Sequence, residues 1–243
     1  MIRTLLSAGA VLACLTLGLT AATLGAADGT PPTGFVALFG GKDFAHWKLA
    51  PGSEGHWVVK NGVIDYDGKS EAKGEDKNLW SRNSYRDLVL MVDWRWSGPV
   101  KPVRHPVILP NGDYDKTPDG KPREEVVMEA GDSGVYLRGS SKSQVNMWCW
   151  PIGSGEVYGY RTDSKQSPEV RAGVTPKKRM DKPIGEWNHM VITLKGDRLT
   201  VELNGEVVME KAQLPGIPPS GPIALQHHGD PIQFKNIYIK ELN

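Results

Sequence analysis

The sequence WNHMVITLKGDRLTVELNGEVVM, residues 187–209, decides the fold class. Apolar residues occupy alternate positions in two runs, formed by Met190, Ile192, Leu194, Leu199, Val201 and Leu203. A period of two is typical of a β-strand with one buried face. Gly196-Asp197 and Asn204-Gly205 separate the runs, and Asn-Gly favours a tight hairpin because both residues tolerate a positive φ. The stretch therefore predicts a three-stranded antiparallel meander.

The same pattern recurs along most of the chain, and no apolar stripe of helical period extends beyond two turns. Further strands are expected at 35–39, 57–60, 63–66, 78–80, 88–96, 133–138, 144–150, 156–160, 223–227 and 232–242. A dozen short strands without helical spacers predict an all-β fold, a jelly-roll sandwich of two antiparallel sheets.

Two segments interrupt this rhythm. Residues 97–123 contain six prolines and little periodicity, and residues 163–183 are poor in strand signals and carry more Lys and Arg than acids. Loops of this length are uncommon in compact domains and often border a functional site, although a surface insertion without a function is the alternative.

Composition excludes several classes of protein. Hydrophobic residues make up 39% of the 243 residues, so the chain can form a core and wholesale disorder is excluded. With 29 basic and 28 acidic residues the formal net charge is +1, which argues against a nucleic-acid partner because such a protein needs a basic surplus.

The N-terminus predicts export. Arg3 precedes an uncharged stretch rich in Leu, Ala and Gly, and Gly25 and Ala27 are suited to a cleavage site, so residues 1–27 are expected to be a signal peptide. An uncleaved anchor and lipid attachment at Cys14 are the alternatives. Residues 28–243 would then form one periplasmic or secreted domain. It contains no second predicted membrane segment, and Cys149 as its single cysteine excludes an intramolecular disulfide.

An ordered set of motifs carries a family resemblance. The set comprises LFGGKDF at 38–44, NG at 61–62, DSGVYLR at 132–138, GEWN at 185–188, LNG at 203–205, GPIALQHHG at 221–229 and FKNI at 234–237. In order and spacing the chain resembles the 3-keto-disaccharide hydrolase family from Gly34 to Leu242. The resemblance implies a concanavalin-like jelly roll and action on glycosides whose sugar is oxidised at C3.

A ketone at C3 explains the chemistry that this resemblance implies. It acidifies the C2 proton, so a base can remove that proton and the C1 substituent can leave by elimination, after which water adds. The site then needs a base, an acid for the leaving oxygen and a stabiliser for the enolate oxygen. The two carboxylates of ordinary glycosidases are not required. No cofactor is certain, and a divalent metal ion is one alternative for the enolate stabiliser, with its ligands unknown.

Strand parity groups the candidate site residues on shared faces. The proposed acids and bases are Asp132, Glu156 and His228. The proposed sugar-binding residues are Arg138, Gln144, Asn146, Trp148, Tyr158, Tyr160 and Gln226. His227 should point to the opposite side from Gln226 and His228. Asn111, Asp113, Asp115 and Asp119 resemble a calcium loop only weakly, because Lys116 replaces the required glycine.

One departure from the family pattern leaves the function open. Family members often carry Glu-x-Gln where this chain has Gln144-Val145-Asn146, and an amide cannot accept a proton as a carboxylate does. Asp132 stands where Asn is usual and is a candidate to compensate. The leading hypothesis is a hydrolase of 3-keto glycosides. A carbohydrate-binding module without turnover, and a structural partner domain, are the alternatives.

Overall fold

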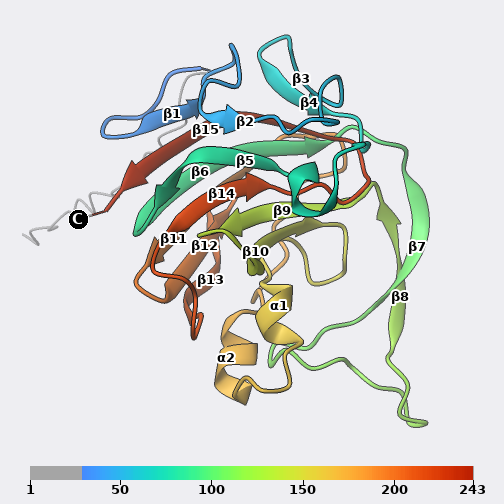
Figure 1. Ribbon diagram of the computed structural model, residues 1–243. Coiled ribbons are helices and arrows are strands. Elements are labelled where there is room, and N and C mark those ends of the chain that lie inside the picture. The colour runs from blue at the N-terminus through green and yellow to red at the C-terminus, as the bar shows by residue number, and fades with distance from the viewer. Residues whose placement is uncertain (1–28, 243) are drawn as a thin grey trace, which may run out of the picture.

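The computed structural model describes residues 29–242, and the expected signal peptide lies outside them. The described chain forms two packed antiparallel sheets and a separate two-stranded hairpin (Figure 1). The jelly-roll prediction is confirmed. Within residues 29–242, none of the helices has the length and apolar character needed to cross a membrane.

The larger sheet has eight strands in the order β13-β12-β11-β6-β15-β4-β3, with β1 paired to β15. Its strands are β1 (Val36–Phe39), β3 (Trp57–Lys60), β4 (Val63–Tyr66), β6 (Leu88–Trp96), β11 (Asn188–Lys195), β12 (Arg198–Leu203), β13 (Glu206–Gln213) and β15 (Ile232–Glu241). The predicted meander is β11–β13, with Met190 opposite Leu203 and Leu194 opposite Leu199.

The smaller sheet has the order β10-β9-β14-β5-β2 and carries the candidate site on its outer face. Its strands are β2 (Trp47–Lys48), β5 (Leu79–Tyr85), β9 (Asp132–Leu137), β10 (Ser140–Trp148) and β14 (Gly221–Leu225). β14 is central in this sheet, although β5, β9 and β14 are far apart in the sequence.

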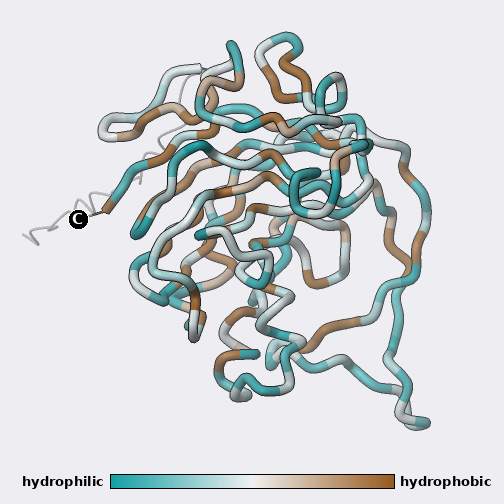
Figure 2. Tube along the Cα trace, viewed as in Figure 1, coloured by the Kyte–Doolittle hydropathy of each residue, from teal (hydrophilic) through white to brown (hydrophobic). Residues whose placement is uncertain are grey.

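The core lies between the two sheets. Buried and partly exposed residues alternate along the whole of β6, so one face of this strand is apolar and closed to water. Figure 2 shows the same alternation of hydrophobic and hydrophilic residues along the strands. Trp47, Trp57 and Trp94 are among the largest side chains with almost no exposed surface. Their burial adds to the apolar area that stabilises the sandwich.

Residues 97–123 were predicted to lack strands, and this is wrong in part. β7 (Lys101–Pro106) pairs in register with β8 (Glu124–Glu129), from Lys101 opposite Glu129 to Pro106 opposite Glu124. This hairpin stands beside the sandwich (Figure 1). Its two prolines weaken the strand signal, yet proline is tolerated in a ribbon of two edge strands.

The predicted strand at 156–160 is also wrong. The short helix α1 (Tyr158–Arg161) occupies this position, followed by α2 (Pro168–Gly173), and η1 (Gly74–Lys77) is a single 3-10 turn. Ser167 caps α2, because its side chain accepts a hydrogen bond from the Val170 amide at 3.3 Å. α1 packs against β10 and supports one side of the site.

Arg138 does not lie on the outer face as strand parity predicted. β9 ends at Leu137, and Arg138 adopts a positive φ of 51°, which ends the alternation of side chains. Its guanidinium instead donates to the carbonyls of Arg86 (2.8 Å), Gly196 (2.8 Å) and Pro218 (3.1 Å) and to Asp87 Oδ1 (2.9 Å). Arg138 therefore ties three loops together at the end of the sandwich remote from the site.

Replacing Arg138 with Ala should lower the free energy of unfolding by about 2–4 kcal/mol, because three carbonyls and Asp87 lose a buried charged donor. Urea denaturation followed by circular dichroism measures this. Arg198→Ala is the control, since Arg198 is 53% exposed in its pair with Asp197 and should cost at most about 1 kcal/mol. Equal stability of the two variants would contradict this role.

Candidate functional site

A pocket of about 400 Å³ opens on the outer face of the smaller sheet. Its volume lies within the range of small-molecule sites, about 300–1,000 Å³. The lining combines carboxylate, imidazole, amide and aromatic side chains, namely those of Asp132, Gln144, Asn146, Trp148, Trp150, Tyr158, Gln226 and His228. Seven of these eight are residues that strand parity proposed. The structure therefore brings them together from β9, β10, α1 and the end of β14.

Two glutamines form the floor of this pocket. Gln144 Nε2 donates to Gln226 Oε1 at 2.6 Å and to the carbonyl of Ser133 at 3.1 Å. Gly134 lies under this pair, and a Cβ placed there would come within 2.5 Å of Gln144 Nε2. Glycine at 134 thus leaves the space that the Gln144 side chain needs to cross β9 and reach Gln226, the residue after β14.

Asp132 is the carboxylate of the pocket. Its Oδ1 is buried and has no hydrogen-bond partner among the described residues. Burial raises the pKa of Asp132 to about 7, with Asp230 and Glu129 adding to the rise and His228 opposing it. A carboxylic acid with this pKa exists in both forms near neutral pH, as a general acid or base requires.

His228 lies at the mouth of the pocket, with 51% of its side chain exposed. Its Nδ1 is 4.0 Å from Asp230 Oδ2, and this carboxylate, with Asp132 and Glu129, raises the pKa of His228 despite partial burial. Asp230 Oδ2 also accepts a hydrogen bond from the Asp132 amide at 3.0 Å. Asp230 therefore links the backbone of one titratable residue to the side chain of the other.

His227 points to the other side of the strand end, as predicted. It forms a hydrogen bond with the hydroxyl of Tyr66, a residue of β4 in the larger sheet. Its amide donates to Asn78 Oδ1 at 2.8 Å, which fixes the backbone on which His228 stands. The alternation predicted for 226–228 thus continues beyond the last residue of β14.

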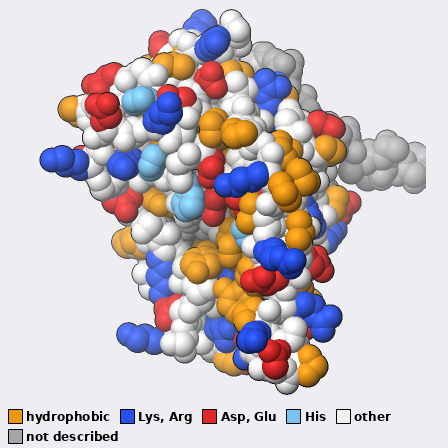
Figure 3. All heavy atoms as spheres, turned by 90° about the vertical axis from the view of Figure 1, so that its right-hand side faces the viewer, with side chains coloured by type: hydrophobic (Ala, Val, Ile, Leu, Met, Phe, Trp, Pro, Cys, Tyr) orange, Lys and Arg blue, Asp and Glu red, His pale blue; other side chains and the backbone are white. Residues whose placement is uncertain are grey.

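Aromatic rings form the wall of the pocket. Trp148 and Trp150 stack with centroids 4.3 Å apart and an interplanar angle of 5°, and Tyr158 meets Trp148 edge-on at 6.2 Å. His105 of β7 stacks on the far side of Trp150 at 4.8 Å and pairs with Glu129 of β8. The β7–β8 hairpin thus supports the wall. Figure 3 shows histidine and acidic side chains gathered on this side of the molecule.

Glu156 and Tyr160 were proposed for the site but do not line the pocket. Glu156 has no exposed surface and forms an ion pair with Arg161, which lies 4.9 Å from the Tyr114 ring and 5.4 Å from the Tyr158 ring. Tyr160 is buried, and its hydroxyl donates to the Pro215 carbonyl at 3.2 Å. The expected strand is a helix here, so Tyr158 and Tyr160 point in different directions rather than to one face.

Three residues of the site were not among the sequence candidates. Trp150 shares the parity of Trp148 and was recognisable from that alternation. Asp230 follows His228 by two residues, a spacing that is a weak signal for a charge partner. His105 could not be found from the sequence, because its contact with Trp150 depends on the position of the hairpin.

The described residues do not offer a metal centre. No group of three or more His, Cys, Asp or Glu side chains within 29–242 has an arrangement that could hold an ion. The weak calcium loop is occupied by ion pairs, since Asp113, Asp115 and Asp119 contact Arg171, Arg123 and Lys121. The His, Cys, Asp and Glu side chains of residues 29–242 therefore do not fit the divalent ion that the sequence suggested as a stabiliser of the enolate.

A family model, the 3-keto-alpha-glucoside-1,2-lyase-like domain, matches residues 34–240. The chain belongs to this family. Membership supports a carbohydrate-active protein and agrees with the resemblance that the sequence motifs carry. No curated protein matches the chain.

Solved structures share the fold of this 3-keto-alpha-glucoside-1,2-lyase-like domain. A candidate glycosyl hydrolase from Parabacteroides distasonis ATCC 8503, solved at 2.13 Å, is 22% identical over 87% of this chain and 85% of its own, with a TM-score of 0.56. A second from the same organism, solved at 1.70 Å, is 20% identical over 86% of this chain and 95% of its own, with a TM-score of 0.55.

Relative to the wild type, Asp132→Asn should raise the free energy of unfolding of this domain more at pH 8 than at pH 4. The pKa of Asp132 is higher in the folded than in the unfolded state, so the folded protein binds more protons between about pH 4 and 7 and loses stability as pH rises through that window. At about 1.4 kcal/mol per pKa unit, the upper limit of this loss of stability is about 4 kcal/mol. The asparagine side chain does not titrate, so the variant avoids this loss.

Urea denaturation at both pH values measures the gain. Asp119→Asn is the control, because the pKa of Asp119 is lowered by hydrogen bonds with Thr117 and Lys121 and its replacement should give no gain at pH 8. The same effect of both substitutions would show that Asp132 is an ordinary surface carboxylate.

Proposed function

We propose that the protein cleaves glycosides of 3-keto sugars by elimination followed by hydration, with the reaction taking place in the pocket over Asp132 and His228. The observation that carries the proposal is the placement of a desolvated carboxyl group and an imidazole in one pocket, beside amide and aromatic side chains. The family match supports the substrate class.

Asp132 is the proposed base. In its ionised form it takes the proton from C2 of the keto sugar, and the electron pair of the C2–H bond moves into the enolate of the C3 ketone. A pKa of about 7 makes Asp132 a stronger base than an ordinary carboxylate, while much of it remains ionised at neutral pH. This residue replaces the glutamate that family members often carry on the next strand, where this chain has Gln144.

His228 is the proposed acid. The enolate pair re-forms the C3 ketone as the C1–C2 double bond forms and the C1–O bond breaks, and the imidazolium donates its proton to the departing oxygen. Asp230 and Asp132 raise the pKa of His228, so that the protonated form persists near neutral pH. Water then adds across the double bond, with its proton going to C2 and its hydroxyl to C1.

Asn146 is the proposed stabiliser of the enolate. Its side chain lines the pocket and is almost completely buried. Within the described residues, the side-chain amide of Asn146 forms no hydrogen bond. An amide N–H directed at a developing oxyanion in a partly dry pocket contributes more than it would in water. The amides of Gln144 and Gln226 are already paired with each other, which suits them to orienting sugar hydroxyls instead.

The alternative function is a carbohydrate-binding module without turnover. It is motivated by the missing Glu-x-Gln pair and needs only the aromatic wall and the amides. We also propose that the domain functions after export, in the periplasm or outside the cell.

The turnover of a 3-keto disaccharide should follow a bell-shaped pH profile. Its rising limb reports ionisation of Asp132 near pH 7, and its falling limb reports loss of the His228 proton above the ordinary value of 6.5. Because the two groups interact, the apparent values belong to the pair. Released monosaccharide is measured from pH 4 to 10.

Two variants test which residue is responsible for each limb of the pH profile. Asp132→Asn should lower kcat by about 10²-fold or more and His228→Ala by at least about 10-fold, the range expected for lost proton transfer. His189→Ala is the matched control, because His189 also pairs with a carboxylate, Asp93 at 2.6 Å, but outside the pocket. Sugar binding by wild type with no turnover at any pH would instead favour the binding module.

A further inference from the structure

A third carboxylate stands between the two titratable residues of the pocket. Asp230 Oδ2 accepts a hydrogen bond from the Asp132 amide at 3.0 Å, and the same oxygen lies 4.0 Å from His228 Nδ1. The longer distance is that of an ion pair and not of a hydrogen bond. Asp230 does not line the pocket, so its influence on the reaction passes through Asp132 and His228.

The surroundings of Asp230 hold its side chain in place. A Cβ on Gly131 would come within 2.4 Å of the Asp230 Cβ and 2.9 Å of the Trp96 ring, so the glycine leaves the slot that Asp230 occupies. The next residue is also bound, because the Pro231 carbonyl accepts a hydrogen bond from the Ser97 amide at 3.2 Å. β15 begins immediately afterwards. The residues that flank β6 and β9 therefore fix the position of this carboxylate.

Asp230 also stays negatively charged while its two neighbours titrate. Partial burial would raise its pKa, but His228, the Asp132 amide and Lys101 of β7 together hold the pKa of Asp230 below its ordinary value. Its charge raises the pKa of His228 and adds to the rise that burial causes in the pKa of Asp132. A constant negative charge at this point thus favours the protonated form of both groups.

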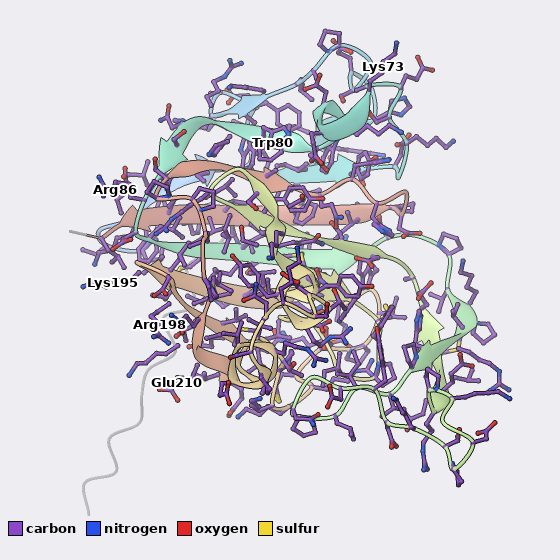
Figure 4. The ribbon with its side chains drawn as sticks, turned by 60° about the horizontal axis from the view of Figure 1, so that its bottom comes forward. Lys73, Trp80, Arg86, Lys195, Arg198 and Glu210 are labelled. Atoms are coloured by element: carbon purple, nitrogen blue, oxygen red, sulfur yellow. The ribbon has the colours of Figure 1, made fainter. Side chains whose placement is uncertain are left out.

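The other charged groups that interact with these three residues come from neighbouring segments, and they are Glu129 of β8, Lys101 of β7 and His227. Glu129 raises the pKa of His228 too, but it pairs with His105, whose protonation compensates its charge. Arg86 and Lys195 lie at the opposite end of the sandwich from the β7–β8 hairpin (Figure 4), so salt screens their charges from the pocket. Asp230 is therefore the group best suited to control both residues.

We propose that Asp230 is a positioning residue for the base and the acid of the pocket. It fixes the backbone on which Asp132 stands, and it keeps Nδ1 of His228 directed at its own carboxylate, which leaves Nε2 for proton transfer. Its constant charge sets the pH range in which the two residues act together. This inference rests on the proposed function for the roles of Asp132 and His228.

Asp230→Asn removes the charge and keeps an oxygen that can accept the hydrogen bond from the Asp132 amide. Both limbs of the pH profile of turnover should move to lower pH by about 0.5 unit or more, because the pKa values of Asp132 and His228 both fall. The maximum rate should stay within about 3-fold of the wild type. A purely structural role would lower the rate at every pH and leave the limbs in place, so unchanged limbs would overturn the proposal.

Asp230→Ala removes the acceptor of the Asp132 amide as well as the charge. It should displace the limbs in the same direction and lower the maximum kcat by about 10-fold relative to Asp230→Asn, because the base is no longer held in position. Rates are measured below the melting temperature of each variant, so that a change in stability does not enter. Equal maxima in the two variants would contradict a role of Asp230 in fixing Asp132.

Asp93→Asn is the matched control. Asp93 also pairs with a histidine, His189 at 2.6 Å, and accepts a second hydrogen bond from Asn236 Nδ2 at 2.8 Å, but it lies outside the pocket. Its replacement should leave both limbs of the pH profile in place. A displacement as large as that of Asp230→Asn would show that the effect does not come from the contacts of Asp230, and the proposal would fail.

Nuclear magnetic resonance of the histidine ring protons separates this inference from the proposed function, because it needs no substrate. The His228 signal is identified by its absence in His228→Ala. Its titration midpoint should lie above 6.5 in the wild type and about 0.5 pH unit or more lower in Asp230→Asn. If no 3-keto disaccharide is cleaved at any pH, the proposed function fails, yet this displacement still supports the role of Asp230. An unchanged midpoint overturns it.

Discussion

The site depends on the alternation of side chains in β9, which separates the core from the pocket within a single strand. Ser133, Val135 and Leu137 face inward and are almost completely buried. Asp132, Gly134 and Tyr136 face the opposite way, where they contribute in turn a carboxyl group, the space for Gln144 and a ring that contacts Trp80. A shift of one residue would exchange these two sets, and the packing of Val135 and Leu137 against the larger sheet opposes it.

The electrostatics of the pocket follow from this placement. Because β9 and the residues after β14 lie side by side, Asp230 reaches the backbone of Asp132 and the side chain of His228. Asp132 itself receives no hydrogen bond to its buried oxygen from the described residues, so burial dominates and raises its pKa. Burial thus raises the pKa of Asp132, whereas the neighbouring carboxylates, Asp230 first, raise the pKa of His228 against the effect of burial.

The sequence predicted the sandwich well because its strands have a clear period of two and its turns contain Asn-Gly or Gly-Asp. It also predicted most of the pocket lining, since parity within a strand fixes the faces of Asp132, Gln144, Asn146, Trp148 and Gln226. Parity failed where the backbone leaves the extended conformation, at Arg138 with its positive φ and at Tyr160 in α1. It could not reveal contacts between distant segments, such as that of His105 with Trp150, because these depend on how the β7–β8 hairpin packs.

The isotopic composition at C2 tests the proposed elimination most directly. When a 3-keto disaccharide is cleaved in D₂O, the mechanism predicts that the released 3-keto sugar carries deuterium at C2, because the proton that Asp132 removes is replaced from solvent during hydration. Recovered substrate and a sample without enzyme measure exchange that occurs without cleavage. Release of a 3-keto sugar that retains its original hydrogen at C2 would contradict the account, since direct displacement at C1 leaves that bond intact.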